Sequence, residues 1–128
     1  MKLEWNKMAE HLEIGRMGEQ EAAKYLKQKG YYIIQSNFRC KLGEIDLIAK
    51  HKDTLVFIEV KTRKNNLYGT PGQAVNKTKQ KKIIKTALYY LKLNDLYHEN
   101  IRFDIVEVWQ HNHRVKNIHI IPNAFFIF

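Results

Sequence analysis

Cysteine is nearly absent from this chain, which has only Cys40 among its 128 residues. A single cysteine cannot form an internal disulfide bond, and it is typical of proteins from a reducing compartment. The sequence also lacks any apolar run as long as a membrane span or a signal-peptide core. Internal repeats and linkers are missing too. These absences predict one soluble, cytoplasmic domain that covers residues 1–128 and has no membrane partner.

Acidic residues are scarce relative to basic ones. Lysine and arginine total 22, aspartate and glutamate total 13, and the formal net charge is +9 at pH 7. Such an excess of positive charge favours a polyanionic partner, and nucleic acid in particular. A basic surface that only keeps the protein soluble is the alternative interpretation.

Hydrophobic periodicity predicts helices and strands in an order typical of an α/β protein. The first helix is expected from Asn6, as its N-cap, to Lys29, just before Gly30. The second is expected to open at Thr70-Pro71-Gly72-Gln73, with threonine as the N-cap and proline as the first helical residue. The strands are expected at residues 31–36, 44–49, 55–61, 101–109 and 115–121.

Two of these strands are predicted to form a hairpin around the polar turn 51–54. Pairing outward from the turn places Asp46 opposite Glu59, and Glu44 opposite Lys61. Opposed side chains have Cβ atoms roughly 5 Å apart, so two carboxylates there are destabilising unless a proton or a cation lies between them. The neighbouring residues are almost all apolar. A hard divalent cation such as Mg²⁺ would resolve this conflict.

The same residues also fit a simpler arrangement, the salt-bridged end of an ordinary amphipathic hairpin. In that arrangement Lys61 neutralises both Glu44 and Glu59. Spacing alone leaves both hypotheses open.

The first of these carboxylates and the later triplet Glu59-Val60-Lys61 resemble the D…(D/E)xK signature of restriction-endonuclease-like nucleases. The match continues in Gly15-Arg16-Met17-Gly18-Glu19, Asn37-Phe38-Arg39, Gly43-Glu44-Ile45-Asp46-Leu47-Ile48, Phe57-Ile58-Glu59-Val60-Lys61-Thr62-Arg63 and Arg102-Phe103-Asp104. From about Ile14 to Val108 the chain resembles the bacterial YraN family, which is grouped with the archaeal Holliday-junction resolvases. The resemblance implies a restriction-endonuclease-like α/β sandwich, with a mixed central sheet of about five strands flanked by helices.

The resemblance also implies a function, that of a metal-dependent DNA endonuclease that hydrolyses phosphodiester bonds, with branched DNA as a candidate substrate. Asp46, Glu59 and the backbone carbonyl of Val60 would hold Mg²⁺ or Mn²⁺, and Glu19 of the first helix would be a further ligand. Lys61 would orient or deprotonate the attacking water and offset the charge that develops on the phosphate. The expected catalytic residues are Glu19, Asp46, Glu59 and Lys61.

The match departs from the superfamily pattern at one position, and one of its matched residues has an alternative role. Ile45 stands where the superfamily often has a proline before the metal-binding aspartate. Glu19 also has an alternative role, because an ion pair with Arg16 three residues earlier would support the helix surface.

A dense cluster of lysines follows the expected catalytic strand, at the start of the second helix. A helix placed there can lay its lysines along a nucleic-acid backbone, although a solvated helix face is the alternative. Tyr68, Tyr89 and Tyr90 could stack on bases, but aromatic residues beside a leucine stripe are more often part of the core. The residues expected to contact DNA are Arg39, Arg63, Lys64, Lys77, Lys79, Lys81 and Lys82.

Two other classes of function stay open. The chain could be a non-catalytic nucleic-acid-binding module of the same fold. It could also be an interaction protein that forms a homodimer through its apolar tail, residues 123–128. The presence of Asp46, Glu59 and Lys61 together argues against both, because a binding module has no need for opposed carboxylates that would repel phosphates. The histidines His111, His113 and His119 have no cysteine partner, so they do not predict a zinc site.

Overall fold

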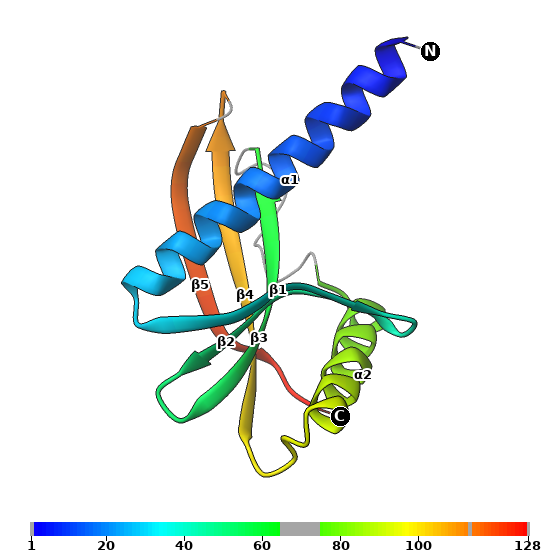
Figure 1. Ribbon diagram of the computed structural model, residues 1–128. Coiled ribbons are helices and arrows are strands. Elements are labelled where there is room, and N and C mark those ends of the chain that lie inside the picture. The colour runs from blue at the N-terminus through cyan, green and yellow to red at the C-terminus, as the bar shows by residue number, and fades with distance from the viewer. Residues whose placement is uncertain (1, 65–74, 113, 128) are drawn as a thin grey trace.

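The computed structural model describes residues 2–64, 75–112 and 114–127, which form two helices and one five-stranded mixed sheet (Figure 1). The sheet order is β1-β2-β3-β4-β5, and only β3 and β4 are parallel. A parallel pair needs a long crossover, and α2 lies within it. This is the restriction-endonuclease-like α/β arrangement that the motifs imply. The elements are α1 (Lys2–Gln28), β1 (Tyr31–Cys40), β2 (Gly43–His51), β3 (Thr54–Arg63), α2 (Lys77–Leu93), β4 (Asn100–His111) and β5 (Arg114–Phe125).

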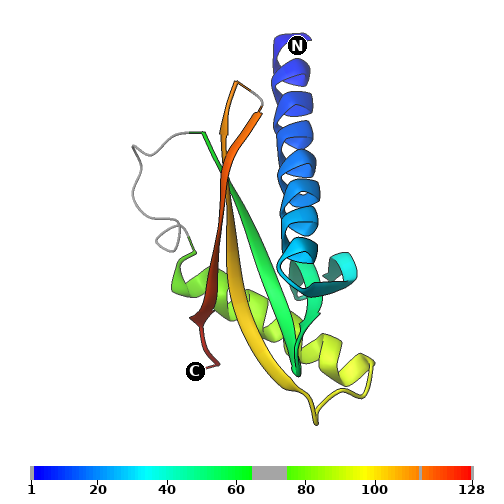
Figure 2. The same ribbon diagram turned by 90° about the vertical axis from the view of Figure 1, so that its left-hand side faces the viewer.

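Each helix covers one face of the sheet. Side chains alternate between faces along a strand, so neighbouring residues of β3 belong to two separate cores. Ile58 joins Ala22 and Leu26 of α1, whereas Phe57 joins Leu91 of α2. Figure 2 shows α1 running along the sheet, with its N-terminal turns extending beyond the strands. Within the described residues, neither helix combines the length and the apolar composition that a membrane crossing requires.

The helices begin at different residues from those expected. Asn6 lies inside α1 and is not its N-cap. The second helix begins at Lys77, and its N-cap is Asn76, whose side chain accepts a hydrogen bond from the Lys79 backbone N–H at 2.9 Å. The expected start at residues 70–73 lies outside the described residues. Asn76 is not helical, so the helix that covers the sheet does not extend back to residue 70. The predicted start is therefore wrong for this helix.

The predicted strands are present, and each is longer than expected. The first, expected at residues 31–36, continues to Cys40 because β1 pairs with β2 as far as their connecting turn. In the next hairpin Lys50 pairs with Leu55, so the predicted register is confirmed as far as Leu47 opposite Ile58. The ladder ends one residue before the predicted pair of Asp46 with Glu59. β4 and β5 form the predicted second hairpin.

Candidate active site

The candidate site lies where β2 and β3 separate. In these strands the ladder extends from the turn to Leu47 opposite Ile58 and stops there. Beyond that point the backbone N–H of Val60 donates to Oδ2 of Asp46, at 2.8 Å. A side-chain carboxylate thus takes the place of a strand carbonyl. The bond satisfies a backbone donor at the separation point, and it fixes Asp46 there.

The helix α1 reaches this point because it approaches β3 closely at Gly18. A β-carbon on Gly18 would overlap the Oγ1 atom of Thr62 on β3, so only glycine fits without a shift. The next residue along the helix is Glu19. The close approach therefore brings the Glu19 carboxylate to β2.

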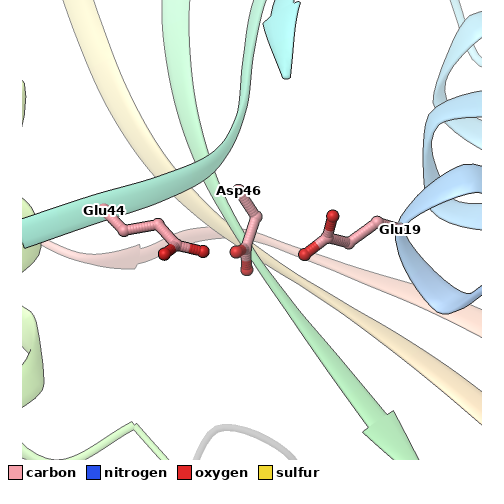
Figure 3. A group of neighbouring side chains, drawn as sticks. All are labelled: Glu19, Glu44 and Asp46. Atoms are coloured by element: carbon pink, nitrogen blue, oxygen red, sulfur yellow. The ribbon is translucent and has the colours of Figure 1, made fainter. Parts of the chain in front are cut away.

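Three carboxylates meet at this site. Glu19, Glu44 and Asp46 each place one oxygen so that the three atoms all lie within 4.8 Å of one another. Figure 3 shows Glu44 and Glu19 extending toward Asp46 from opposite sides, the first from β2 and the second from α1. Carboxylate oxygens are the ligands that Mg²⁺ and Mn²⁺ prefer. The donor set therefore fits such an ion, and it includes Glu19 and Asp46, two of the residues that are predicted to be ligands.

Glu44 is a member of this group that the sequence motifs do not assign to the metal. The prediction that it lies opposite Lys61 is wrong, because β2 has already left β3 before Glu44. Its carboxylate pairs instead with Arg39 of β1, with Nε and Oε2 at 3.2 Å. A signal for its role is present in the sequence, since Glu44 and Asp46 are two residues apart and can share a strand face.

The ionised carboxylates of the group are unfavourable on their own. Burial raises the pKa of Asp46 to about 8, and the negative charge of Glu59 acts in the same direction. The hydrogen bond from Val60 opposes this rise. Burial also raises the pKa of Glu19, and the charge of Glu44 adds to the effect. A cation bound between these groups would favour their ionised forms.

Glu59 lies beside this group, and two lysines hold it. Its side chain is 7% exposed, and its Oε1 atom lies 3.5 Å from Nζ of Lys61 and 3.4 Å from Nζ of Lys79. The Glu59–Lys61 ion pair of the alternative arrangement, the salt-bridged hairpin, is therefore present, whereas its Glu44–Lys61 pair is not, because Glu44 pairs with Arg39. Lys79 comes from the first turn of α2, which has no acidic residue. Cations are unfavourable at a helix N-terminus, so Glu59 provides the compensating charge.

The remaining basic residues predicted to contact DNA lie at several places around the site. Arg63 lies near Glu107 of β4; burial raises the pKa of Glu107, and the Arg63 charge opposes that rise. Four lysines have exposed side chains at the end of β3 and on α2: Lys64, Lys77, Lys81 and Lys82.

A family model described as "Uncharacterised protein family UPF0102" matches residues 18–108. The chain belongs to this family. UPF0102 is the YraN family, so the resemblance drawn from the motifs is confirmed. The matched region begins at Gly18 and includes every residue of the candidate site described above.

Curated UPF0102 proteins cover nearly the whole chain. A UPF0102 protein of Caldicellulosiruptor saccharolyticus is 44% identical over 114 residues, which are 88% of this chain and 97% of the relative. One from Clostridium acetobutylicum is 47% identical over 88% of this chain and 93% of its own length. One from Clostridium botulinum (strain 657 / Type Ba4) is 48% identical over 90% of this chain and 95% of its own length. These names state the family and no activity.

One family motif of this UPF0102 chain has a structural role. Asp104 of β4 is wholly buried and accepts hydrogen bonds from the Tyr31 hydroxyl, the Arg102 guanidinium and the Asn123 backbone N–H. Burial and the Asp104 charge raise the pKa of Tyr31 to about 12. His51 stacks on Tyr31 with ring centroids 4.1 Å apart. Asp104 therefore ties β1, β4 and β5 together, and His51 connects β2 to the same network.

Proposed function

We propose that the protein is a metal-dependent DNA endonuclease that hydrolyses phosphodiester bonds. The observation that carries the proposal is the meeting of Glu19, Glu44 and Asp46 within 4.8 Å. These residues come from two elements, and the close approach at Gly18 and the Val60 hydrogen bond hold them there. Like charges gathered around the buried Asp46 carboxylate are destabilising in themselves, and a bound divalent cation offsets that cost.

Glu19, Glu44 and Asp46 would hold Mg²⁺ or Mn²⁺. When bound, such an ion lowers the pKa of a coordinated water and polarises the phosphodiester. This ligand set differs from the one that the resemblance implies, which has Glu59 and the Val60 carbonyl in place of Glu44. The geometry favours Glu44 because its carboxylate oxygen lies within 4.8 Å of those of Glu19 and Asp46. Glu59 is paired instead with Lys61 and Lys79.

The two lysines on Glu59 supply positive charge next to the carboxylates. Lys61 is 26% exposed and Lys79 is 47% exposed, so both ammonium groups are open to a phosphate. Their role would be to stabilise the negative charge that develops on the phosphate, with Lys61 also orienting the attacking water. Glu59 would be a positioning residue that holds both lysines.

The proposed substrate is DNA because the formal net charge is +9 and because exposed lysines extend along α2 beyond the site. Branched DNA remains the more specific proposal, in line with the resemblance to junction resolvases.

The test is a cleavage panel of single-stranded, duplex, flapped and four-way DNA with Mg²⁺ or Mn²⁺. Wild type should cleave at least one substrate, and Asp46→Asn should abolish cleavage. Lys61→Ala should remove most of it and leave metal binding intact, because the substitution deletes transition-state stabilisation and no ligand. Glu99→Gln is the matched control, since it removes a carboxylate that pairs with Lys50 outside the site.

The outcomes separate the two main functions. Metal-dependent cleavage that is lost in Asp46→Asn and kept in Glu99→Gln would support the nuclease. Binding of DNA without cleavage of any substrate would overturn it and favour the non-catalytic nucleic-acid-binding module.

A further inference from the structure

A cavity lies next to the carboxylate group, between the β1–β2 turn and the second half of α2. Its volume is about 630 Å³, within the range of roughly 300–1,000 Å³ that is typical of sites for small ligands. No acidic side chain lines it among the described residues. Its lining includes Phe38, Arg39, Lys41, Leu42, Tyr89 and Leu93.

The cavity is built where α2 packs closely on the turn. Gly43 lies against the Thr86 hydroxyl, and a β-carbon on Gly43 would come within 2.8 Å of that oxygen. One turn later along α2 is Tyr89, and Leu93 follows after another four residues, so both side chains lie on the same side of the helix. The buried ring of Phe38 stands 6.4 Å from the Tyr89 ring, measured between centroids.

One of the exposed apolar side chains that line this cavity, Tyr89, carries a flat aromatic ring. Tyr89 is 41% exposed and Leu93 is 61% exposed, although both line the cavity. Large apolar side chains that remain exposed around a hollow indicate a binding surface. An aromatic ring open on one side is suited to stacking on another flat ring.

The charges around the cavity indicate which kind of flat ring would stack on Tyr89. Arg39 and Lys41 are exposed cations on the turn, and Lys85 is an exposed cation one helical turn before Tyr89. Among the described residues the lining holds cations and no carboxylate, and the Glu44 carboxylate beside it is paired with Arg39. Such a surface is complementary to a base attached to phosphates. Arg39 lines the cavity and also pairs with Glu44 at 3.2 Å, so this residue connects the cavity with the carboxylate group.

We infer that this cavity binds one unpaired nucleobase of a DNA strand, stacked on Tyr89, while the backbone of the same strand passes the carboxylate group. A base inside a duplex is paired and stacked, so it can enter only when it is already unpaired or is extruded from the helix. The inference rests on the proposed function for the identity of the strand as DNA. It assigns a substrate class, which is DNA with an unpaired base beside the bond that is cut.

The test measures binding in EDTA, so that cleavage plays no part. Oligonucleotides carry 2-aminopurine either in an unpaired position of a flap or in the matching paired duplex. Wild type should bind the flap more tightly and quench the unpaired 2-aminopurine by stacking. Tyr89→Ala should weaken flap binding by about tenfold, within the range for loss of one base–aromatic stack, and should abolish the quench.

Control variants isolate the ring of Tyr89. Tyr89→Phe keeps the ring and should keep both affinity and quench. Leu93→Ala, a second change within the cavity, should weaken both. Tyr32→Ala removes a tyrosine that is 73% exposed at the start of β1 and should change neither.

Several results would overturn the inference. One is equal affinity of wild type for flap and duplex, and another is an unchanged quench in Tyr89→Ala. A third is that Tyr89→Ala alters self-association and not DNA binding, because the cavity would then receive the apolar tail of a second copy. The readout is independent of nuclease activity. A protein that quenches but never cleaves refutes the nuclease alone, whereas one that cleaves and ignores Tyr89→Ala refutes this inference alone.

Discussion

At the scale of single residues, Asp46 decides the character of the site. Its carboxylate accepts the Val60 N–H and also lies within reach of Glu19 and Glu44. Because it is buried, its ionised form is disfavoured in the absence of a cation. The protonation of this one group therefore links the stability of the fold to the occupation of the site.

We expect the metal-free protein to lose stability as the pH rises from 3.8 to about 8. The folded-state pKa of Asp46, about 8, lies above the ordinary value of 3.8. A group with a raised pKa contributes stability that is fully present below its ordinary pKa and is lost as the pH rises through the folded value. Melting temperatures in EDTA should therefore fall more steeply with pH for wild type than for Asp46→Asn.

Glu99→Gln serves as the control and should keep the wild-type slope, because Glu99 pairs with Lys50 outside the site. Added Mg²⁺ should raise the melting temperature of wild type and of this control, but not that of Asp46→Asn, since a ligand that binds only the folded state stabilises it. If the melting temperatures of all three proteins fell equally with pH, or rose equally with Mg²⁺, Asp46 would not be a ligand of the site.

At the scale of elements, local sequence patterns predict which residues form strands and turns better than they predict where two paired strands separate. The register of Lys50 with Leu55 follows from a short turn and alternating side chains, and it is confirmed. The separation of β2 from β3 depends on α1 and on the bend of the β1–β2 hairpin, which are tertiary contacts. For that reason the local pattern predicts Glu44 opposite Lys61, whereas the structure places it with Asp46.

The start of α2 shows a second limit of local signals. Thr70 with the following proline and Asn76 are both favourable N-caps, and sequence alone does not rank them. Packing on the sheet decides which residues form the helix that is observed, which begins at Lys77. The role of Lys79 as a partner of Glu59 depends on this start, so local patterns do not predict it either.

Two glycines of α1 offer a direct test of its contact with β3. A β-carbon at Gly15 meets nothing within 4 Å, whereas one at Gly18 overlaps the Thr62 hydroxyl. Gly15→Ala should stabilise the protein by up to about 1 kcal/mol through helix propensity. Gly18→Ala should destabilise it by about 1–3 kcal/mol through overpacking, and it should reduce the Mg²⁺ shift by displacing Glu19.

Urea unfolding measures both changes. Adding Thr62→Ala to Gly18→Ala should recover part of the lost stability and of the Mg²⁺ shift, because it removes the overlapping hydroxyl. Equal effects of the two single substitutions would contradict a close helix–strand contact at Gly18.

The lysines of α2 provide a further prediction at this scale. Replacing Lys77, Lys82 and Lys85 with glutamine should weaken DNA binding and reduce its salt slope by about 0.9 for each phosphate that is no longer neutralised. Lys79 is left unchanged because it pairs with Glu59. Binding isotherms at several salt concentrations are the measurement.

A matched variant replaces the exposed Lys24, Lys27 and Lys52 with glutamine and removes the same three charges elsewhere. It should change the slope much less. Equal slopes in the two variants would mean that binding follows the net charge and not the surface of α2.

At the scale of the whole molecule, the carboxylate site depends on a sheet that is tied together by a second polar network. Asp104 is wholly buried, and its bonds reach Tyr31 of β1 and Asn123 of β5, while Arg102 also contacts Nδ1 of His51 on β2 at 3.1 Å. Sequence spacing predicts no role for Asp104, because two of its partners, Tyr31 and Asn123, come from strands far away in the chain. A buried charge of this kind stabilises the fold only while every partner is present.

We expect Asp104→Asn to lower the free energy of unfolding by about 3–5 kcal/mol, because it leaves the half-buried Arg102 guanidinium without its carboxylate. The double variant Arg102→Gln with Asp104→Asn removes both charges and should recover part of that loss. Urea unfolding measures the two. Because the network shares no residue with the carboxylate group, Mg²⁺ should still raise the melting temperature of Asp104→Asn as it does for wild type. A folded Asp104→Asn protein without a Mg²⁺ shift would instead place Asp104 in the metal site.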